Sequence, residues 1–307
     1  MKFPIYFSKK IAFSKDNKNN LSRVIVFIGR LSVALGIIVS LVTVSTGLGS
    51  KKAIKNRMAD FVGHISVKST KSNSSYNSSV LHQEGLNVKG IQNLPDVSNT
   101  QSYATVSGIL RTEENFAGVI LKGVAKDFDA ERFQSFMVAG EVPKFTEEGY
   151  NNQVILSDKI ANDLHLKPKD SIVAIFSKED QQPIYRKFEI SGIYKTDIKM
   201  IDDLFIIGDI NHVRKIQDMA KTEVGGIDIF LKDSDDIDAV YPTIEKLIGY
   251  KNYAEKATDK YPQIVDWINI FDTNIGLIIT IMLIVVVINI IMVLLILIIE
   301  RTNSIGM

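Results

Sequence analysis

The sequence predicts a membrane protein in which two transmembrane α-helices flank a large α+β extracytoplasmic domain. Two observations support this prediction. A long stretch without charged residues lies near each end of the chain, and the polar region between them alternates short strand-like and helix-like patterns. Of the 307 residues, 46% are hydrophobic and 23% are charged. This mixture indicates that apolar residues are concentrated in particular segments, and the length allows more than one folding unit.

Two apolar segments are long enough to cross a membrane. The first carries no charge over Leu31–Ser50, and the second carries none over Thr273–Ile299. About 20 helical residues span a bilayer core, whereas a buried core helix rarely reaches this length and composition. The first segment is too long for a signal peptide and begins late in the chain. We therefore predict transmembrane helices over 21–50 and 272–299.

Basic residues predict the orientation of the chain. Seven lysines and arginines precede the uncharged stretch Leu31–Ser50, against the single acid Asp16. Cytoplasmic flanks carry such an excess, so we expect both termini in the cytoplasm and residues 51–271 outside it. Basic residues that follow the first span weaken this argument without reversing it. Residues 1–20 mix aromatic, apolar and lysine residues, which predicts an amphipathic elbow on the cytoplasmic membrane surface.

Small and polar residues inside the spans predict contact with other helices. In the first span, small residues recur at spacings of three and four, so they share one face and allow close helix approach, although ordinary glycine and serine usage is an alternative. In the second span, the Asn289 amide lies in an apolar helix and requires a hydrogen-bond partner. We assign these residues to helix packing or a lateral gate, with substrate contact an alternative for Asn289. The small residues are Gly29, Ser32, Gly36, Ser40, Thr43 and Gly47.

The region between the spans predicts strands with interspersed helices, which is typical of an α+β domain, as one unit or as two subdomains. The helix after the strand 153–156 begins at Ser157 and Asp158, which are suitable N-cap residues. Helical continuations are expected next to both spans, over 53–62 and 261–271, and a loop over 68–79. The other predicted strands are 64–68, 102–111, 116–123, 171–176, 185–194, 204–208 and 227–231, and the other helices are 211–219 and 237–248.

The sequence contains no pattern that indicates catalysis, a cofactor or a metal. Its four histidines are scattered, and it lacks both a Gly-x-Ser-x-Gly nucleophile motif and a glycine-rich phosphate loop. The acidic run Asp233–Asp238 lacks the glycine and distal glutamate of a calcium loop, so we interpret it as a helix-capping turn. Cysteine is absent, and the net charge of +1 gives no indication of nucleic-acid binding.

Several stretches, taken in order, resemble a known family. They are LSVALGIIVSLVTVSTGLGSKKAIKNRMADFVGHISV, GVILKGVAKDF, VILSDKIANDLHLKPKDSIVAIF, FEISGIYKTDIKMIDDLFIIGDINHVRKI and NIIMVLLILIIERTNSIGM. This succession is similar to ABC-transporter permeases of the lipoprotein-releasing LolC/LolE type, which belong with the MacB and FtsX families. The individual motifs are weak, but their order and spacing cover nearly the whole chain. Family members have four spans, so the resemblance predicts a permease truncated after the second transmembrane helix.

The resemblance implies a function and a set of partners. It implies a non-catalytic permease subunit in the bacterial inner membrane, with residues 51–271 in the periplasm. A separate ABC ATPase would bind ATP and magnesium, and its motion would pass through the spans to the outer domain. A second permease copy or paralogue, membrane lipid, a lipoprotein substrate and a periplasmic carrier are the other implied partners.

The resemblance also implies site residues. Residues 300–307 match the start of the family's coupling helix, which contacts the ATPase. A contact of Met58 and Phe61 with the lipid substrate is a separate hypothesis, based on their place just outside the first span. The coupling residues are Glu300, Arg301, Thr302, Ile305 and Gly306.

Three other functions remain open from the sequence. The nearest is MacB-like export of peptides or toxins, although MacB carries a fused ATPase ahead of its first span and this chain does not. A second is an FtsX-like regulator without transported substrate, which the size of the outer domain disfavours. A third is a two-span receptor, although ERTNSIGM after the second span does not begin a signalling helix.

Overall fold

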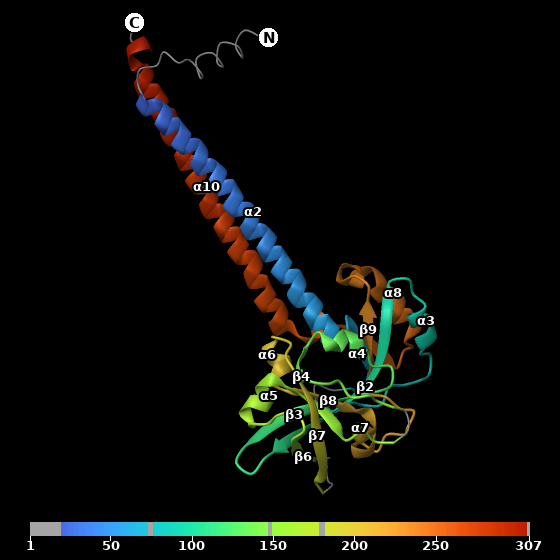
Figure 1. Ribbon diagram of the computed structural model, residues 1–307. Helices are drawn as coiled ribbons and strands as arrows, with labels where there is room; N and C mark the ends of the chain where they lie inside the picture. The colour runs from blue at the N-terminus through green and yellow to red at the C-terminus, as the bar shows by residue number, and fades with distance from the viewer. Residues whose placement is uncertain (1–19, 73–75, 147–148, 178–181, 306–307) are drawn as a thin grey trace. The chain divides into compact units, whose positions relative to one another are not determined.

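The structure, a computed structural model, describes residues 20–72, 76–146, 149–177 and 182–305 (Figure 1). It divides into two compact units. The first contains the residues before 53 and after 265, and the second contains Ala53–Val265. Each unit is described by itself below.

The first unit consists of most of two long helices, α2 (Asn20–Val62) and α10 (Pro262–Ile305), which lie side by side (Figure 1). By length and composition, both are able to cross a membrane, over Phe27–Val62 and Ile268–Ile296. Their large apolar side chains, such as Leu35 at 60% and Leu283 at 62%, are exposed. In a soluble protein such a surface would be unfavourable, whereas a bilayer would cover it. The predicted continuations are confirmed, because α2 runs unbroken to Val62 and α10 begins at Pro262.

The second unit contains ten strands that pair into one sheet. Their order is β10-β1-β9-β2-β3-β8-β5-β7-β4, and β6 pairs with β2 and β7 off this path. The predicted fold class is therefore confirmed. The strands are β1 (Ile65–Ser69), β2 (Val97–Arg111), β3 (Phe116–Val124), β4 (Met137–Gly140), β5 (Gln153–Ser157), β6 (Ser171–Phe176), β7 (Ile184–Tyr194), β8 (Phe205–Asp209), β9 (Gly226–Leu231) and β10 (Asn252–Lys256).

The hairpin of β2 and β3 connects two halves of this sheet. The first part of β2 pairs with β9, and its last residues pair with β6. We call β1, β9 and β10 the β9 half, and β4 to β8 the β7 half. Strand β3 joins the β7 half through its parallel pairing with β8. The β9 half is continuous in sequence with both long helices, since β1 follows α2 and β10 precedes α10.

Short helices cover the sheet, and several of them begin at a residue whose side chain caps the first turn. Ser157 begins α5 as predicted, with its hydroxyl accepting a hydrogen bond from the Ile160 amide. The acidic run also begins a helix as expected, because the Asp233 side chain caps η1 immediately before α8. Helix α7 packs on β2 and β3. The helices are α3 (Val88–Gln92), α4 (Ala130–Gln134), α5 (Asp158–Asp163), α6 (Lys199–Asp202), α7 (Ile210–Ile216), η1 (Ser234–Asp236), α8 (Ile237–Leu247) and α9 (Ala257–Lys260).

Two strands and part of a third were not predicted. Strand β4 is four residues long and mostly exposed, and β10 has the mixed sequence NYAEK, so neither shows apolar alternation. Strand β2 begins at Val97, five residues earlier than predicted, because its polar start pairs with the buried strand β9. In the predicted loop 68–79, Ser78 is bonded to β2, with its amide donating to the Thr105 carbonyl at 2.9 Å.

Candidate functional site at the end of helix α2

Helix α2 ends at a glycine in the left-handed backbone region. Gly63 has φ +80°, and its amide donates to the Ala59 carbonyl at 2.8 Å. A Cβ at this position would lie 2.9 Å from the Asp228 Cβ, so both the backbone conformation and the available space require glycine. The chain then enters β1 at Ile65, after only two connecting residues.

A buried ion pair holds the last turn of α2. The Lys122 ammonium on β3 donates to the Phe61 carbonyl at 3.0 Å and to the Asp228 carboxylate on β9 at 2.7 Å. The Lys122 and Asp228 side chains are only 10% and 3% exposed. The last carbonyls of a helix lack partners within it, and a cation there complements the helix dipole. We call this arrangement the buried attachment.

The second carboxylate oxygen of Asp228 completes the buried attachment. It accepts from the Ser66 hydroxyl at 2.6 Å, and that hydroxyl also contacts the Tyr103 hydroxyl at 2.9 Å. Burial lowers the pKa of Lys122, and the Asp228 charge opposes that shift. Burial also raises the pKa of Tyr103, with Asp228 adding to the effect. Lys122 and Asp228 compensate each other's charge inside the domain. Removal of either side chain would therefore leave the other charge buried without a counter-charge.

His64 supports the same turn in its neutral form. Its Nδ1 accepts from the Leu231 amide at 3.1 Å, which requires that this nitrogen carry no proton. Burial and, to a smaller extent, the positive charge of Arg132 lower the pKa of His64 to about 4. The neutral ring is therefore the form present at pH 7.

Aromatic side chains surround the end of α2. The Phe61 ring lies 5.5 Å from the Tyr194 ring on β7 and 5.9 Å from the Phe205 ring on β8, measured between centroids. It also contacts Phe133 and Phe136, so Phe61 joins α2 to the β7 half. These distances are typical of favourable aromatic pairs.

The two residues assigned to substrate contact are buried in the second unit. Met58 is 1% exposed and Phe61 is 4% exposed, so this conformation leaves no surface on either side chain for a lipid substrate. Both are apolar residues directly after an apolar span, and the sequence alone does not show that the domain covers them. Substrate contact at Met58 and Phe61 stays a prediction that requires a rearrangement of the domain.

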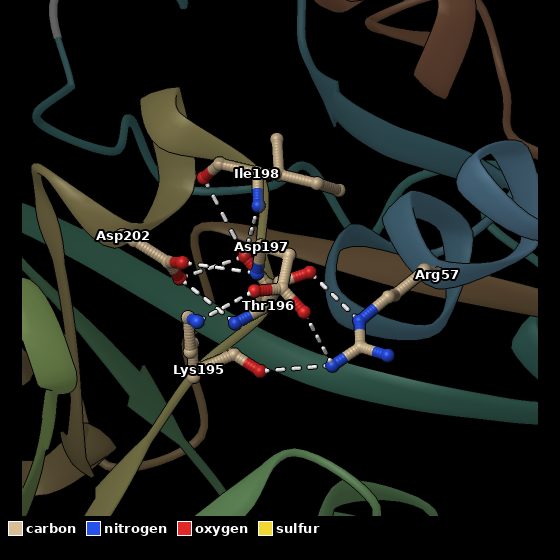
Figure 2. Close-up of polar contacts among 6 residues, drawn as sticks. All are labelled: Arg57, Lys195, Thr196, Asp197, Ile198 and Asp202. Carbon is tan, nitrogen blue, oxygen red and sulfur yellow. Dashed lines mark hydrogen bonds and ion pairs between the residues drawn. The ribbon is translucent and has the colours of Figure 1, made fainter.

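Arg57 forms a second, more exposed attachment (Figure 2). Its Nε donates to the Thr196 carbonyl at 2.7 Å, and its Nη2 donates to the Lys195 carbonyl at 3.2 Å. The same Nη2 lies 3.3 Å from the Asp197 carboxylate. The side chains of Arg57 and Asp197 are 43% and 56% exposed. We call this arrangement the exposed attachment.

The turn that receives Arg57 is held by Asp202. Its carboxylate accepts from the Thr196 amide at 3.0 Å, the Thr196 hydroxyl at 2.7 Å and the Asp197 amide at 3.0 Å (Figure 2). Asp197 has φ +61°, a conformation that aspartate tolerates better than most residues. Asp202 thereby fixes the turn in which the two carbonyls accept from the guanidinium of Arg57.

A small cavity lies next to the buried attachment. Its volume of about 10 Å³ is close to that needed for one water molecule, which is too small for a substrate. Burial raises the pKa of Asp60 in its lining, although the neighbouring Arg132 opposes this shift. Among the described residues, no group of acidic or histidine side chains is arranged to hold a metal ion. The cavity is lined by Asp60, Phe61, Gln101, Lys122, Phe128, Asp129, Arg132, Phe133 and Ile207.

In the first unit, the structure brings most of the predicted packing residues against α10. The Asn289 amide donates to the Ser32 hydroxyl at 2.8 Å. A Cβ on Gly29 would lie 2.5 Å from a methyl carbon of Val293, and a Cβ on Gly47 would lie 2.3 Å from Ile275 Cδ1. Gly36 faces Val286 and Met282, while Ser40 and Thr43 are half-buried. A role of this face as a lateral gate stays a prediction.

The residues assigned to ATPase contact lie at the end of α10. The helix runs to Ile305, but the side chains of Glu300, Arg301, Thr302 and Ile305, together with Gly306, lie outside the described residues. The expected elbow over 1–20 lies outside them too, except for the backbone of Asn20.

Comparison with known proteins identifies the family. Residues 30–247 match the model of the MacB-like periplasmic core domain, which is well over half of the chain. The chain belongs to this family. Membership supports a general role as a permease component of an ABC-type transporter, a kind of component that is not itself catalytic. Together with the two apolar helices, it indicates a membrane-embedded protein with an extracytoplasmic domain.

Two solved structures resemble this MacB-family chain at low sequence identity. The extracellular domain of the ABC-type transporter YknZ from Gram-positive bacteria is 15% identical, with a TM-score of 0.42, and the match covers 62% of this chain and 99% of that one. The periplasmic region of MacB from Actinobacillus actinomycetemcomitans is 13% identical, with a TM-score of 0.42, covering 66% and 92% respectively. No curated protein matches the chain.

The sequence analysis did not identify the residues of the two attachments. One signal was present, because Lys122 interrupts the apolar run of β3, and a lysine in a buried strand requires a partner. Its partner Asp228 is 106 residues away, so only the pairing of β9 with β2 reveals the contact. Arg57 and Asp202 carry no distinguishing local pattern.

Proposed function

We propose that this MacB-family chain is the permease subunit of an ABC-type transporter, in which ATP hydrolysis by a separate subunit moves the extracytoplasmic domain. The observation that supports this proposal is the continuity of α2. It is one helix of 43 residues, about 65 Å long, whose first part is apolar and whose last turns are held by the domain at two places. A displacement of this helix is therefore transmitted to both halves of the sheet.

The ATPase would act in trans. The sequence carries no phosphate-binding loop, so ATP and magnesium would bind to the partner, and the coupling residues at the end of α10 would contact it. The test is purification of the tagged full chain from its native membrane, with ATP hydrolysis measured in the purified sample. We expect Arg301→Glu to reduce both the co-purified ATPase subunit and the hydrolysis, and the matched control Arg186→Glu on β7 to leave both unchanged. If the unaltered chain brings no ATPase, the transporter function is wrong.

The proposed cargo is a lipoprotein released from the inner membrane to a soluble carrier. Acyl chains enter laterally between helices, and the small-residue face of α2 provides a seam that a helix movement would open. The measurement is ATP-dependent appearance of a triacylated lipoprotein in the soluble fraction, from vesicles that contain the purified complex and carrier. Appearance of the lipoprotein in the soluble fraction to the same extent without ATP would contradict this cargo.

We propose that the carrier docks on an exposed apolar patch of the sheet. Ile109 on β2 pairs with Ile175 on β6, which pairs with Tyr185 on β7, so the three side chains share one sheet face. Phe116 and Val173 share that face, because both pair with Arg111, two residues after Ile109. Phe116 is 79% exposed and Tyr185 is 62% exposed. We expect Phe116→Ser with Tyr185→Ser to slow transfer to the carrier while ATP hydrolysis continues.

Export of peptides or toxins is the second candidate function. The observation that favours it is the family match itself, which is to the MacB-like core domain. The two candidates differ in their cargo, so the vesicle assay separates them when a secreted peptide replaces the lipoprotein. Transport of the peptide without release of the lipoprotein would support export.

A further inference from the structure

The chain connects the membrane helices directly to only one half of the sheet. Helix α2 continues through Gly63 into β1, and α10 follows β10 through α9, so both helices are covalently next to the β9 half. The β7 half meets the end of α2 through side chains instead. These contacts are the Phe61 ring against Tyr194 and the guanidinium of Arg57 against the turn after β7.

The contact of Arg57 has the properties of a releasable one. The side chains of Arg57 and Asp197 are both about half exposed, so water and salt ions compete with the contact between them. The accepting carbonyls belong to a turn that Asp202 keeps in shape without help from Arg57. The guanidinium is thus able to leave while the turn stays formed, and to bind the same two carbonyls when it returns.

The buried attachment has the opposite properties. Lys122 and Asp228 are almost fully enclosed, and each is satisfied only by the other and by neighbouring buried groups. Separation of this pair would leave two charges unpaired in the core, so it remains closed as long as the domain is folded. The β9 half is therefore fixed to α2 by a buried ion pair. The β7 half is held to α2 by the buried Phe61 ring and by the Arg57 contact, and of these two only the Arg57 contact opens at low cost.

We propose that Arg57 and the turn 195–202 form a latch that couples α2 to the β7 half and releases it during the transport cycle. In the latched state, α2 and both halves of the sheet move as one body. In the released state, the β7 half turns about the β2–β3 hairpin and the Phe61 ring contacts, while the β9 half stays with α2. This inference rests on the proposed permease function, because it assigns the moving part within that cycle.

The test measures two distances in the full chain, which contains no native cysteine and so accepts spin labels at engineered ones. The first pair, Ala53→Cys with Lys187→Cys, reports on α2 and the β7 half. The second pair, Ala53→Cys with Lys246→Cys, reports on α2 and α8, which packs on β10 of the β9 half. We expect Arg57→Gln to shift and broaden the first distance distribution and to leave the second unchanged.

The matched control is Lys159→Gln, which removes an exposed ion pair with Asp163 that does not involve α2. It should leave both distances unchanged. High salt should move the first distance of the unaltered chain in the same direction as Arg57→Gln, because it screens the same contact. If Arg57→Gln changes neither distance, or changes both equally, the latch is wrong.

A second measurement separates the latch from the permease function. In the complex purified with its ATPase, a non-hydrolysable ATP analogue should shift the first distance of the unaltered chain toward the Arg57→Gln value. If the complex forms and hydrolyses ATP but this distance never changes, the latch fails and the permease function stands. If no ATPase associates, the permease function fails, and the role of the latch in a transport cycle fails with it.

Discussion

The two attachments at the end of α2 use similar groups in different surroundings. Each joins a cation to a backbone carbonyl and to an aspartate, but Lys122 and Asp228 are at most 10% exposed, whereas Arg57 and Asp197 are about half exposed. The exposed contact stabilises the domain less than the buried one, because water competes with the exposed contact and is excluded from the buried one. Burial, rather than the count of hydrogen bonds, therefore decides which attachment is permanent.

The largest expected effect comes from the buried attachment. Lys122→Met should lower the free energy of unfolding of the domain by about 3–5 kcal/mol, because it leaves the Asp228 carboxylate buried without a counter-charge. Thermal unfolding of the full chain in detergent measures this loss. The double variant Lys122→Met with Asp228→Asn should lose less, since no unpaired charge remains. Equal losses in the two variants would show that the ion pair is not the cause.

A change of pH should have an intermediate effect on the stability of the domain, through protonation of His64. The lowered pKa of His64 means that the unfolded chain binds a proton more readily than the folded chain. Stability is therefore full above pH 6.5 and falls as the pH drops towards about 4, by up to roughly 3 kcal/mol. His64→Asn keeps an acceptor for the Leu231 amide and should flatten this dependence in unfolding scans at pH 7 and pH 5. His82→Asn is the control that should retain it.

The smallest effect is expected from the exposed attachment. Arg57→Gln should cost the domain less than about 1 kcal/mol at low salt, and the difference from the unaltered chain should shrink further in 1 M KCl. Thermal unfolding of both proteins at two salt concentrations provides the comparison. A loss of several kcal/mol would mean that Arg57 is part of the permanent structure, and the contrast between the two attachments would disappear.

The sequence was most informative where a residue's role depends on its neighbours along the chain. Strand β6 has the predicted bounds because SIVAIF is a short apolar run between polar residues. The Ser157 cap was visible because a capping residue and its target amide are three positions apart. Both long helices were predicted for the same reason, since uncharged length is a local property.

The parts that sequence reasoning missed depend on contacts between distant segments. Strand β10 pairs with β1, which lies almost 190 residues away, and its own composition gives no strand signal. Met58 and Phe61 look like lipid-facing residues because they follow an apolar span, yet the folded domain encloses them. The site at the end of α2 could therefore be located only after the pairing of β9 with β1 and β2, and of β2 with β3, was known.

The spacing of residues along α2 has a consequence for how this helix can vary. Gly36 and Gly47 are separated by 11 residues, which is close to three turns, so they lie along one side of the helix. Both face side chains of α10, so this side of α2 packs along α10. One residue added between the two glycines would rotate their contacts with α10 apart by about 100°, whereas 11 would keep them in phase. The length of this part of α2 can therefore change only in steps that preserve the angle between the two glycines.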